Sequence, residues 1–220
     1  AANCAPSRAS LMTGLYTPRH GVFTVGNSDR GKAAHRRLIP ATNKTVLTRD
    51  LPTMAQILKH AGYRTAVAGK WHLSDDPIPY GFDTNFGGLK WGAPKSYFSP
   101  YRNPKLKDGP KGEHLPARLA TDLCHWIRKA EEKNERFFVY FPFYSVHTPI
   151  QARADLTAKY NGKSGTHHRN AKYAAMVEAM DLAVGQILDL LDELKLASNT
   201  LVVFTSDNGP HGGVSNARPL

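Results

Sequence analysis

Cys4 and Arg8 stand four residues apart in the stretch NCAPSRASLMTG, a spacing that places a thiol and a cation on one face of a helix. Pro6 suits the first turn of a helix and Gly14 suits its end, so we expect a short helix that begins near Cys4. The positive end of that helix and Arg8 would together stabilise a negative charge. Taken alone, Cys4 is explained equally well as a small buried thiol.

Polar side chains stand at or just beyond the ends of three expected strands. Each strand is a short apolar run, and the third ends in Ser-Asp-Asn-Gly. Because ligands in open α/β sheets bind at the carboxyl ends of strands, we expect these side chains to meet in one site. The expected strands are 64–71, 137–146 and 200–209, and the side chains are Lys70 and His72, then His147, then Asp207 and Asn208.

These residue types indicate chemistry on an anion. Lysine, arginine and histidine can stabilise charge on the oxygens of a phosphoryl or sulfuryl group and protonate its leaving group. Asp207 and Asn208 offer oxygen ligands for Ca²⁺ or Mg²⁺, although Asp-Asn-Gly is also a common turn. Six other histidines have no such context and receive no role: His20, His35, His60, His125, His167 and His168.

Other anion chemistries fit the spacing poorly. A cysteine phosphatase needs Cys-x5-Arg, but Ser10 stands six residues after Cys4. No Walker-type phosphate loop occurs. A papain-like protease stays formally open with Cys4 and His147, but its local cysteine signature is absent.

The composition is that of a globular chain with a basic balance. The 220 residues are 41% hydrophobic, with a net charge of +11, which favours an anionic partner. No zinc-finger spacing or ribonucleoprotein motif supports nucleic acid, and no apolar run approaches the ~20 residues of a membrane span. Two cysteines do not make a disulfide framework, and we interpret Cys124 as a packing residue.

The order of the elements predicts an α/β fold with a mostly parallel central sheet flanked by helices. A helix at 50–62 would be capped by Asp50 and would bury Leu51, Met54, Leu58 and Ala61. Two longer helices are expected at 116–133 and 168–196, and a long irregular segment at 85–114. The expected inward faces are Leu119, Leu123, Trp126, Ile127 and Ala130 on the first long helix, and Tyr173, Met176, Val177, Met180, Val184, Ile187, Leu191 and Leu194 on the second.

Four motifs resemble those of the formylglycine-dependent (type I) sulfatase family, within the alkaline-phosphatase-like superfamily. Residues 4–14, CAPSRASLMTG, match the pattern C-x-P-S-R-x-x-x-[LM]-T-G in full. Residues 62–72, GYRTAVAGKWH, are similar to the second sulfatase signature. VHTP at 146–149 and SDNG at 206–209 follow in the family's order.

The resemblance implies that Cys4 is oxidised after translation to formylglycine, whose hydrated form attacks sulfur. Pro6, Ser7 and Arg8 would be recognised by the formylglycine-generating enzyme. Modified Cys4 would bind Ca²⁺, or Mg²⁺, together with Asp207 and Asn208.

It also implies roles for the basic residues. Arg8 would steady the nucleophile, while Lys70 and His147 would hold the sulfate oxygens. His147 would help to protonate the leaving group, and His72 would take the proton that releases sulfate. The function implied is sulfuric ester hydrolysis of a sulfated carbohydrate.

Some of the family's features are not in this sequence. Its paired metal-binding aspartates normally lie upstream of the cysteine, and a further basic residue normally follows a stretch like NARPL (216–220). We therefore expect residues 1–220 to be part of a sulfatase catalytic domain, without the smaller C-terminal domain and inactive alone. The family's habit indicates export to the periplasm, the cell exterior or a lysosome, with a signal peptide outside this chain.

Alternatives stay open at this point. Phosphonate and phosphate ester hydrolases share the cysteine motif but tend to carry His where this chain has Asn208. A non-catalytic polyanion-binding protein would also explain the net charge. The basic, aromatic segment 90–114 could stack on sugars and meet sulfates through Lys105, Lys107 and Lys111, or could be a solvated surface loop.

Overall fold

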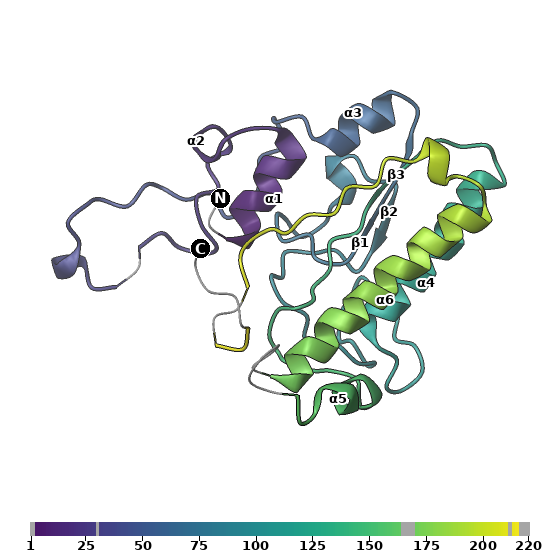
Figure 1. Ribbon diagram of the computed structural model, residues 1–220. Helices are drawn as coiled ribbons and strands as arrows, with labels where there is room; N and C mark the ends of the chain where they lie inside the picture. The colour runs from purple at the N-terminus through teal and green to yellow at the C-terminus, as the bar shows by residue number, and fades with distance from the viewer. Residues whose placement is uncertain (1–2, 30, 164–169, 211–212, 216–220) are drawn as a thin grey trace.

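A small parallel sheet lies at the centre of the molecule, between two layers of helices (Figure 1). The computed structural model describes residues 3–29, 31–163, 170–210 and 213–215. The strands are β1 (Arg64–Ala68), β2 (Thr84–Phe86) and β3 (Phe137–Tyr140), in the order β2-β1-β3. In the parallel ladders, Ala66 lies opposite Thr84 on one side and Val139 on the other. The predicted α/β class is confirmed.

The central strand β1 is buried on both faces, because alternate side chains enter different cores. Ala66 and Ala68 pack with residues of α4 (Leu115–Glu131) and α6 (Ala171–Glu193). Val67 packs on the opposite face with α1 (Cys4–Thr13) and α3 (Met54–His60). The remaining helical turns are short: α2 (Thr17–His20), η1 (Ala33–His35), η2 (Ile78–Tyr80), α5 (Ala154–Tyr160) and η3 (Ala197–Asn199).

The inward face predicted for α4 is confirmed, since all five of its apolar residues are buried. The stripe predicted for α6 is right only in part. Val177 is exposed, and the close packing of α6 on α4 and α5 instead buries alanines at 175, 179 and 183. Small residues allow helices to approach closely, so part of the contact face lies on positions that a search for large apolar residues overlooks. His168 lies outside the described residues.

Two predicted helix starts differ in outcome. The helix at Cys4 is confirmed, and Gly14 ends it in the left-handed conformation at φ 69°. The cap predicted at Asp50 is wrong, because α3 begins four residues later and Thr53 caps it. The Thr53 hydroxyl accepts the backbone N–H of Gln56, whose side chain in turn accepts the N–H of Thr53, which satisfies both donors. Ala61 is exposed.

All three predicted strands are shorter than expected or absent, and the first, expected over 64–71, ends at Ala68. The run 137–146 forms a strand only to Tyr140, and β3 is half-buried at the edge of the sheet. The segment 201–204 runs past β3 in Figure 1 but forms no strand, and its four apolar side chains are 54–89% exposed. An extended segment becomes a strand only by pairing, and this one has no ladder partner among the described residues.

The irregular segment 85–114 contains the end of β2 and then packs into the body of the protein. Tyr97 and Tyr101 are fully buried, and Leu106 joins the same core. The segment is therefore solvated only in part: these two rings are not free to stack on a sugar, whereas Lys105, Lys107 and Lys111 are exposed. Over the described part of the chain, no helix is both long and apolar enough to cross a membrane.

Candidate active site

The chain segments that follow β1 and β3 are held together at the carboxyl edge of the sheet. Gly69 follows β1 at φ 108°, and a Cβ there would lie 2.3 Å from the carbonyl oxygen of Pro142, which follows β3. Only glycine allows this approach. The next residue, Lys70, donates its backbone N–H to the same carbonyl oxygen at 2.8 Å. This contact places Lys70 beside the segment that carries His147.

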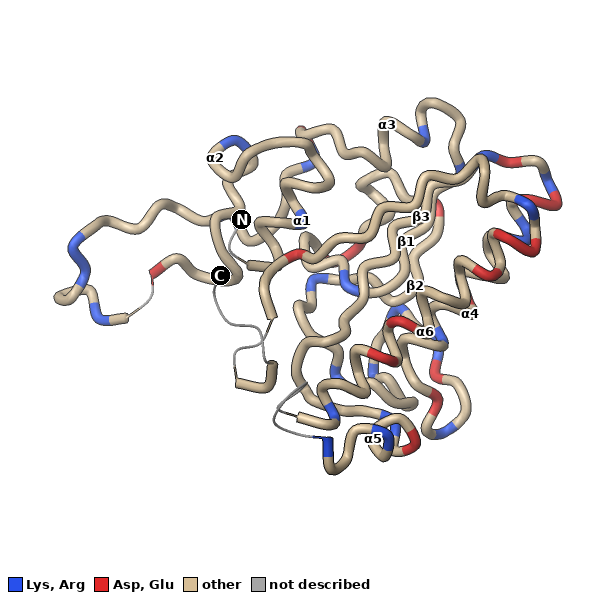
Figure 2. Tube along the Cα trace, in the orientation of Figure 1, with Lys and Arg blue, Asp and Glu red and all other residues tan. Residues whose placement is uncertain are grey.

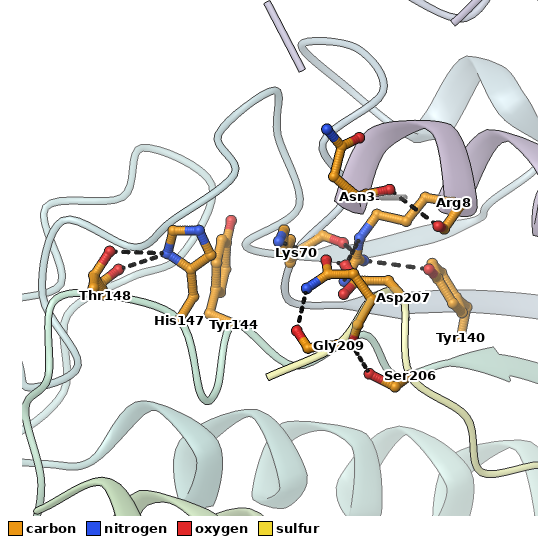
Figure 3. A network of polar contacts seen from close by, with 12 residues as sticks. Asn3, Arg8, Lys70, Tyr140, Tyr144, His147, Thr148, Ser206, Asp207 and Gly209 are labelled. Carbon is orange, nitrogen blue, oxygen red and sulfur yellow. Dashed lines mark hydrogen bonds and ion pairs between the residues drawn. The ribbon is translucent and has the colours of Figure 1, made fainter. Parts of the chain in front are cut away.

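Arg8, Lys70 and Asp207 form a buried ionic cluster from three distant parts of the sequence (Figure 3). Arg8 contacts Asp207 Oδ2 through Nη2 at 2.7 Å and donates to the same oxygen from Nε at 2.8 Å. Lys70 Nζ lies 3.6 Å from that oxygen. Arg8 Nη1 also donates to the Lys70 carbonyl and to the Tyr140 hydroxyl. The predicted meeting of Lys70 and Asp207 is present in the structure, and Arg8 joins them.

This cluster keeps its charges away from solvent. Arg8 and Lys70 are both buried. Burial alone would raise the pKa of Asp207, but the charges of Arg8 and then Lys70 outweigh it and lower that pKa. Two cations and one carboxylate leave an excess positive charge, which suits an anionic ligand.

His72 is fixed by its backbone and by a glycine that faces its ring. Its φ of 62° lies in the left-handed region, and its N–H donates to the Leu89 carbonyl at 2.9 Å. A Cβ on Gly92 would lie 2.6 Å from the ring. Burial, followed by the charges of Lys70 and Arg8, lowers the pKa of His72 to about 4. The imidazole is therefore neutral at pH 7 and can accept a proton.

His147 belongs to the same edge but is exposed to solvent. Its backbone N–H donates to the Tyr144 carbonyl at 3.0 Å, and its Nδ1 lies 2.9 Å from the Thr148 carbonyl oxygen. Tyr97 Oη lies 2.7 Å from the Tyr144 carbonyl oxygen and 3.0 Å from that of His147, so it donates to this turn. In the view of Figure 3, Lys70 lies between His147 and the Arg8–Asp207 pair.

Cys4 is the first residue of α1 and is partly exposed. Arg8 lies one turn further along the same helix, as its spacing predicts. The thiol is therefore not deeply buried, and it stands where the helix dipole favours negative charge. Cys124, by contrast, is buried in α4, which confirms its interpretation as a packing residue.

The residues present offer two oxygen ligands for a hard cation. Asn208 Oδ1 is buried and has no hydrogen-bond partner, as expected of an atom suited to a metal. Asp207 adds a carboxylate, although Arg8 and Lys70 occupy one of its oxygens. Ca²⁺ takes roughly six to eight oxygens, and within the described ranges no three His, Cys, Asp or Glu side chains gather to hold an ion. Asp207 and Asn208 thus fit as part of a ligand set.

The turn interpretation of Ser-Asp-Asn-Gly also holds. Ser206 Oγ donates to the Asn208 carbonyl at 2.7 Å, and Asn208 Nδ2 donates to the Gly209 carbonyl at 2.8 Å. These local bonds bend the chain, and the bend directs Asp207 toward Arg8 (Figure 3). The motif therefore serves both as a turn and as a part of the site.

Sequence reasoning missed three residues that shape this site: Tyr140, Tyr97 and Gly92. Tyr140 is the last residue of β3, so its position at a strand end was the available signal. Gly92 and Tyr97 stand in an irregular segment without periodicity, and only the folded chain places them against His72 and the His147 turn.

Of the histidines that received no role, His35, His60 and His125 are exposed. His20 is buried and structural, because its ring pairs with the Ser10 hydroxyl at 3.0 Å and accepts the Val22 N–H at 3.1 Å. His167 and His168 lie outside the described residues, as does the stretch 216–220.

Comparison with known proteins shows which family this chain resembles. A protein-family model described as "Sulfatase" matches residues 1–219. A "Sulfatase" from Formosa agariphila is 32% identical over 99% of this chain and 50% of its own length. The "N-acetylgalactosamine-6-sulfatase" of Canis lupus familiaris is 30% identical over 97% of this chain and 43% of its own length.

A solved structure gives the same result for the fold. The crystal structure of Ps i-CgsB, in complex with k-i-k-neocarrahexaose, matches with a TM-score of 0.67 and 25% identity over 87% of this chain and 45% of that chain. The chain thus spans half or less of the length of the relatives that it matches.

Proposed function

The chain belongs to the sulfatase family, and we propose that its site hydrolyses sulfate esters of a carbohydrate once Cys4 has been oxidised to formylglycine. The observation that carries this proposal is the Arg8–Lys70–Asp207 cluster, in which Arg8 is supplied by the helix that begins at Cys4. The names of the relatives support a sugar substrate, since one is an N-acetylgalactosamine-6-sulfatase and one structure is a complex with k-i-k-neocarrahexaose.

Two groups would supply chemistry that the twenty amino acids lack. Formylglycine at position 4, made by a formylglycine-generating enzyme, provides in its hydrated form the oxygen nucleophile. Ca²⁺, or Mg²⁺, held in part by Asp207 and Asn208, offsets the charge of the sulfate and favours the anionic nucleophile. The partial exposure of Cys4 and the unpartnered oxygen of Asn208 support both assignments.

The cations would bind the sulfate. Lys70 Nζ lies 3.6 Å from Asp207 Oδ2, which is a long ion-pair distance. The ammonium group of Lys70 would therefore have protons available to donate to sulfate oxygens. Arg8 is held more tightly by Asp207 and by the Lys70 carbonyl, so its role is to fix that carboxylate and the start of α1. His147, on the segment after β3, would add a second contact to the sulfate.

Two histidines would divide the proton transfers. A pKa lowered to about 4 makes His72 a weaker base but keeps its ring unprotonated at pH 7, so a free ring nitrogen would be available for the proton when sulfate is released. His147 is exposed, where a departing sugar hydroxyl would lie, and donates a proton to that oxygen. The buried His72 would thus act in the release of sulfate, and the exposed His147 in the departure of the sugar.

The first test is the mass of the peptide that carries Cys4, taken from the full natural polypeptide made in its native host. We expect a loss of mass equal to the exchange of thiol for aldehyde, together with reaction with a hydrazide. An unmodified thiol in that host would contradict the mechanism and would favour a polyanion-binding protein.

The second test separates sulfate from phosphorus chemistry. A sulfate ester, a phosphate ester and a phosphonate ester of the same phenol are compared with the full natural polypeptide. We expect the highest kcat/KM for the sulfate ester. A higher value for the phosphonate or phosphate ester would move the assignment to that branch of the superfamily. The proposal includes export from the cytoplasm, which fractionation of the native host would test.

A further inference from the structure

A strongly basic arm extends from the body of the molecule beside α1 (Figures 1 and 2). The arm is residues 26–44, of which all but residue 30 are described, and the described residues include four Lys or Arg and one Asp. Lys32 and Arg37 are exposed and form no ion pair with a described residue. Arg36 lies 3.4 Å from Asp29, which neutralises the one acidic group in the arm. The arm therefore carries unbalanced positive charge into solvent.

The base of the arm is fixed to the body by one asparagine. Asn43 Oδ1 accepts the backbone N–H groups of Phe23 at 2.7 Å and Thr24 at 3.1 Å, and Asn43 Nδ2 donates to the Thr24 carbonyl at 3.0 Å. The N–H of Lys44 donates to the Gly21 carbonyl at 2.9 Å. These bonds join the outgoing and returning segments of the arm where they meet the body.

The fixed base forms a wall of a cavity that reaches the active site. The cavity has a volume of about 330 Å³, near the lower end of the range for small-molecule sites, which is roughly 300–1,000 Å³. Residues 24–26 and 45–46, from the two sides of the arm's base, line it together with His72. Lys90 and Asp75 stand at its edge as an exposed ion pair of 2.9 Å.

We propose that this cavity and the arm together bind a sulfated polysaccharide chain, so that the enzyme acts on polymers in preference to single sugars. The proposal rests on the proposed function for the cavity, which would take the sugar unit that carries the sulfate under attack. The arm would then contact sulfates on units further along the same chain.

The charge and position of the arm favour this partner over a protein. The excess charge is of one sign, which attracts a polyanion over about 8–10 Å at physiological salt. His72 lines the same cavity as residues 24–26 and 45–46 at the base of the arm, so the arm begins beside the active site. Leu38 and Ile39 are 84% and 97% exposed near these cations, and they are the feature that a second copy of the chain would use instead.

The test compares two matched pairs of substitutions in the full natural polypeptide. The arm variant is Lys32→Ser with Arg37→Ser. The control variant is Lys129→Ser with Lys133→Ser, which removes the same charge from exposed residues at the amino ends of the strands, opposite the site. Binding of size-fractionated chondroitin sulfate and carrageenan is titrated at several salt concentrations, and turnover of 4-nitrophenyl sulfate is measured on the same preparations.

We expect the arm variant to bind long fractions roughly tenfold more weakly at low salt, with a salt dependence reduced by on the order of one to two released ions. Its loss should shrink as the fractions become shorter, and the control variant should bind like the parent. Equal binding by the arm variant and the parent, or an equal loss in the control variant, would overturn the proposal.

Two further measurements keep the outcomes distinct. If the parent hydrolyses neither 4-nitrophenyl sulfate nor the polymers, the proposed function fails, while the binding comparison still decides the role of the arm. A Leu38→Ser, Ile39→Ser variant tests for a second copy. A smaller mass in solution for this variant, with polymer binding lost in parallel, would assign the arm to self-association and overturn the proposal.

Discussion

The arm (26–44) and the segment 87–114 are alike in sequence and opposite in structure. Both are irregular and basic, with six Lys or Arg against two acids in 87–114. The segment 87–114 contains four aromatic residues and the arm contains none. Rings supply large apolar areas to bury, so the segment folds back onto the sheet, whereas the arm stays in solvent. Of these two basic segments, the one with aromatic residues packs onto the sheet and the one without them projects into solvent.

This difference also divides their work. The packed segment helps to position two histidines of the active site, since Gly92 faces the ring of His72 and Tyr97 donates to the turn that leads to His147. The projecting arm contributes charge outside it. Substitutions in the two regions should therefore give opposite signatures, with stability and turnover affected in one and binding of polymers in the other.

The largest expected contrast is in stability. Tyr97→Ala should lower the free energy of unfolding by about 3–5 kcal/mol, because it empties a buried aromatic site. Leu38→Ala in the arm should change it by less than about 0.5 kcal/mol, because that side chain is already exposed. Urea unfolding of both variants measures the difference. A comparable loss in the two variants would mean that the arm is packed in solution.

The second prediction concerns how the stability contributed by segment 87–114 depends on pH. Burial lowers the pKa of His114 to about 4, whereas the unfolded chain titrates near 6.5. Below pH 6.5 the unfolded state therefore binds a proton that the folded state refuses, and stability falls as pH falls from 6.5 toward 4. His114 accounts for about 3 kcal/mol of this loss. Unfolding curves at several pH values should show a shallower slope for His114→Gln, and an unchanged slope would disprove this account.

The third contrast is catalytic. Gly92→Ala places a methyl group 2.6 Å from the His72 ring, so the ring must move. We expect kcat to fall by about 10- to 100-fold, because displacements on the order of 1 Å cost that much. Gly185→Ala is the control, since space around that helical glycine is open. A parent-like kcat for Gly92→Ala, in full natural polypeptide with intact formylglycine, would remove the positioning role.

A milder change in the same segment isolates two hydrogen bonds. Tyr97→Phe keeps the ring and removes the hydroxyl that donates to the turn at 144–147. We expect a loss of about 1–2 kcal/mol in stability and a fall in kcat larger than the change in KM. Thermal unfolding and steady-state kinetics measure both. Loss of stability with kcat unchanged would show that the turn keeps its shape without the hydroxyl.

How much of this was predictable depends on whether the signal is local. The helix at Cys4, the face of α4 and the strand-end residues Lys70 and His147 follow from capping, periodicity and topology. The failures needed information from distant residues. Thr53 rather than Asp50 caps α3, because the Gln56 side chain completes a reciprocal pair of hydrogen bonds with it. The apolar run 201–204 forms no strand, because no described segment pairs with it. Pairing and packing are properties of the whole chain.

The smallest expected effect concerns the lysines of 87–114. Lys105 Nζ lies 2.7 Å from Asp76 Oδ2, with the two side chains 41% and 32% exposed, and such pairs contribute about 0–1 kcal/mol. Lys105→Ser should therefore lower stability by less than about 1 kcal/mol, and less at high salt. Since the tyrosines of this segment are buried, we also expect Lys105, Lys107 and Lys111 to be dispensable for turnover of a sulfated oligosaccharide. A tenfold loss of turnover in the triple Ser variant would show that segment 87–114 contacts the substrate, and the contrast with the arm would no longer hold.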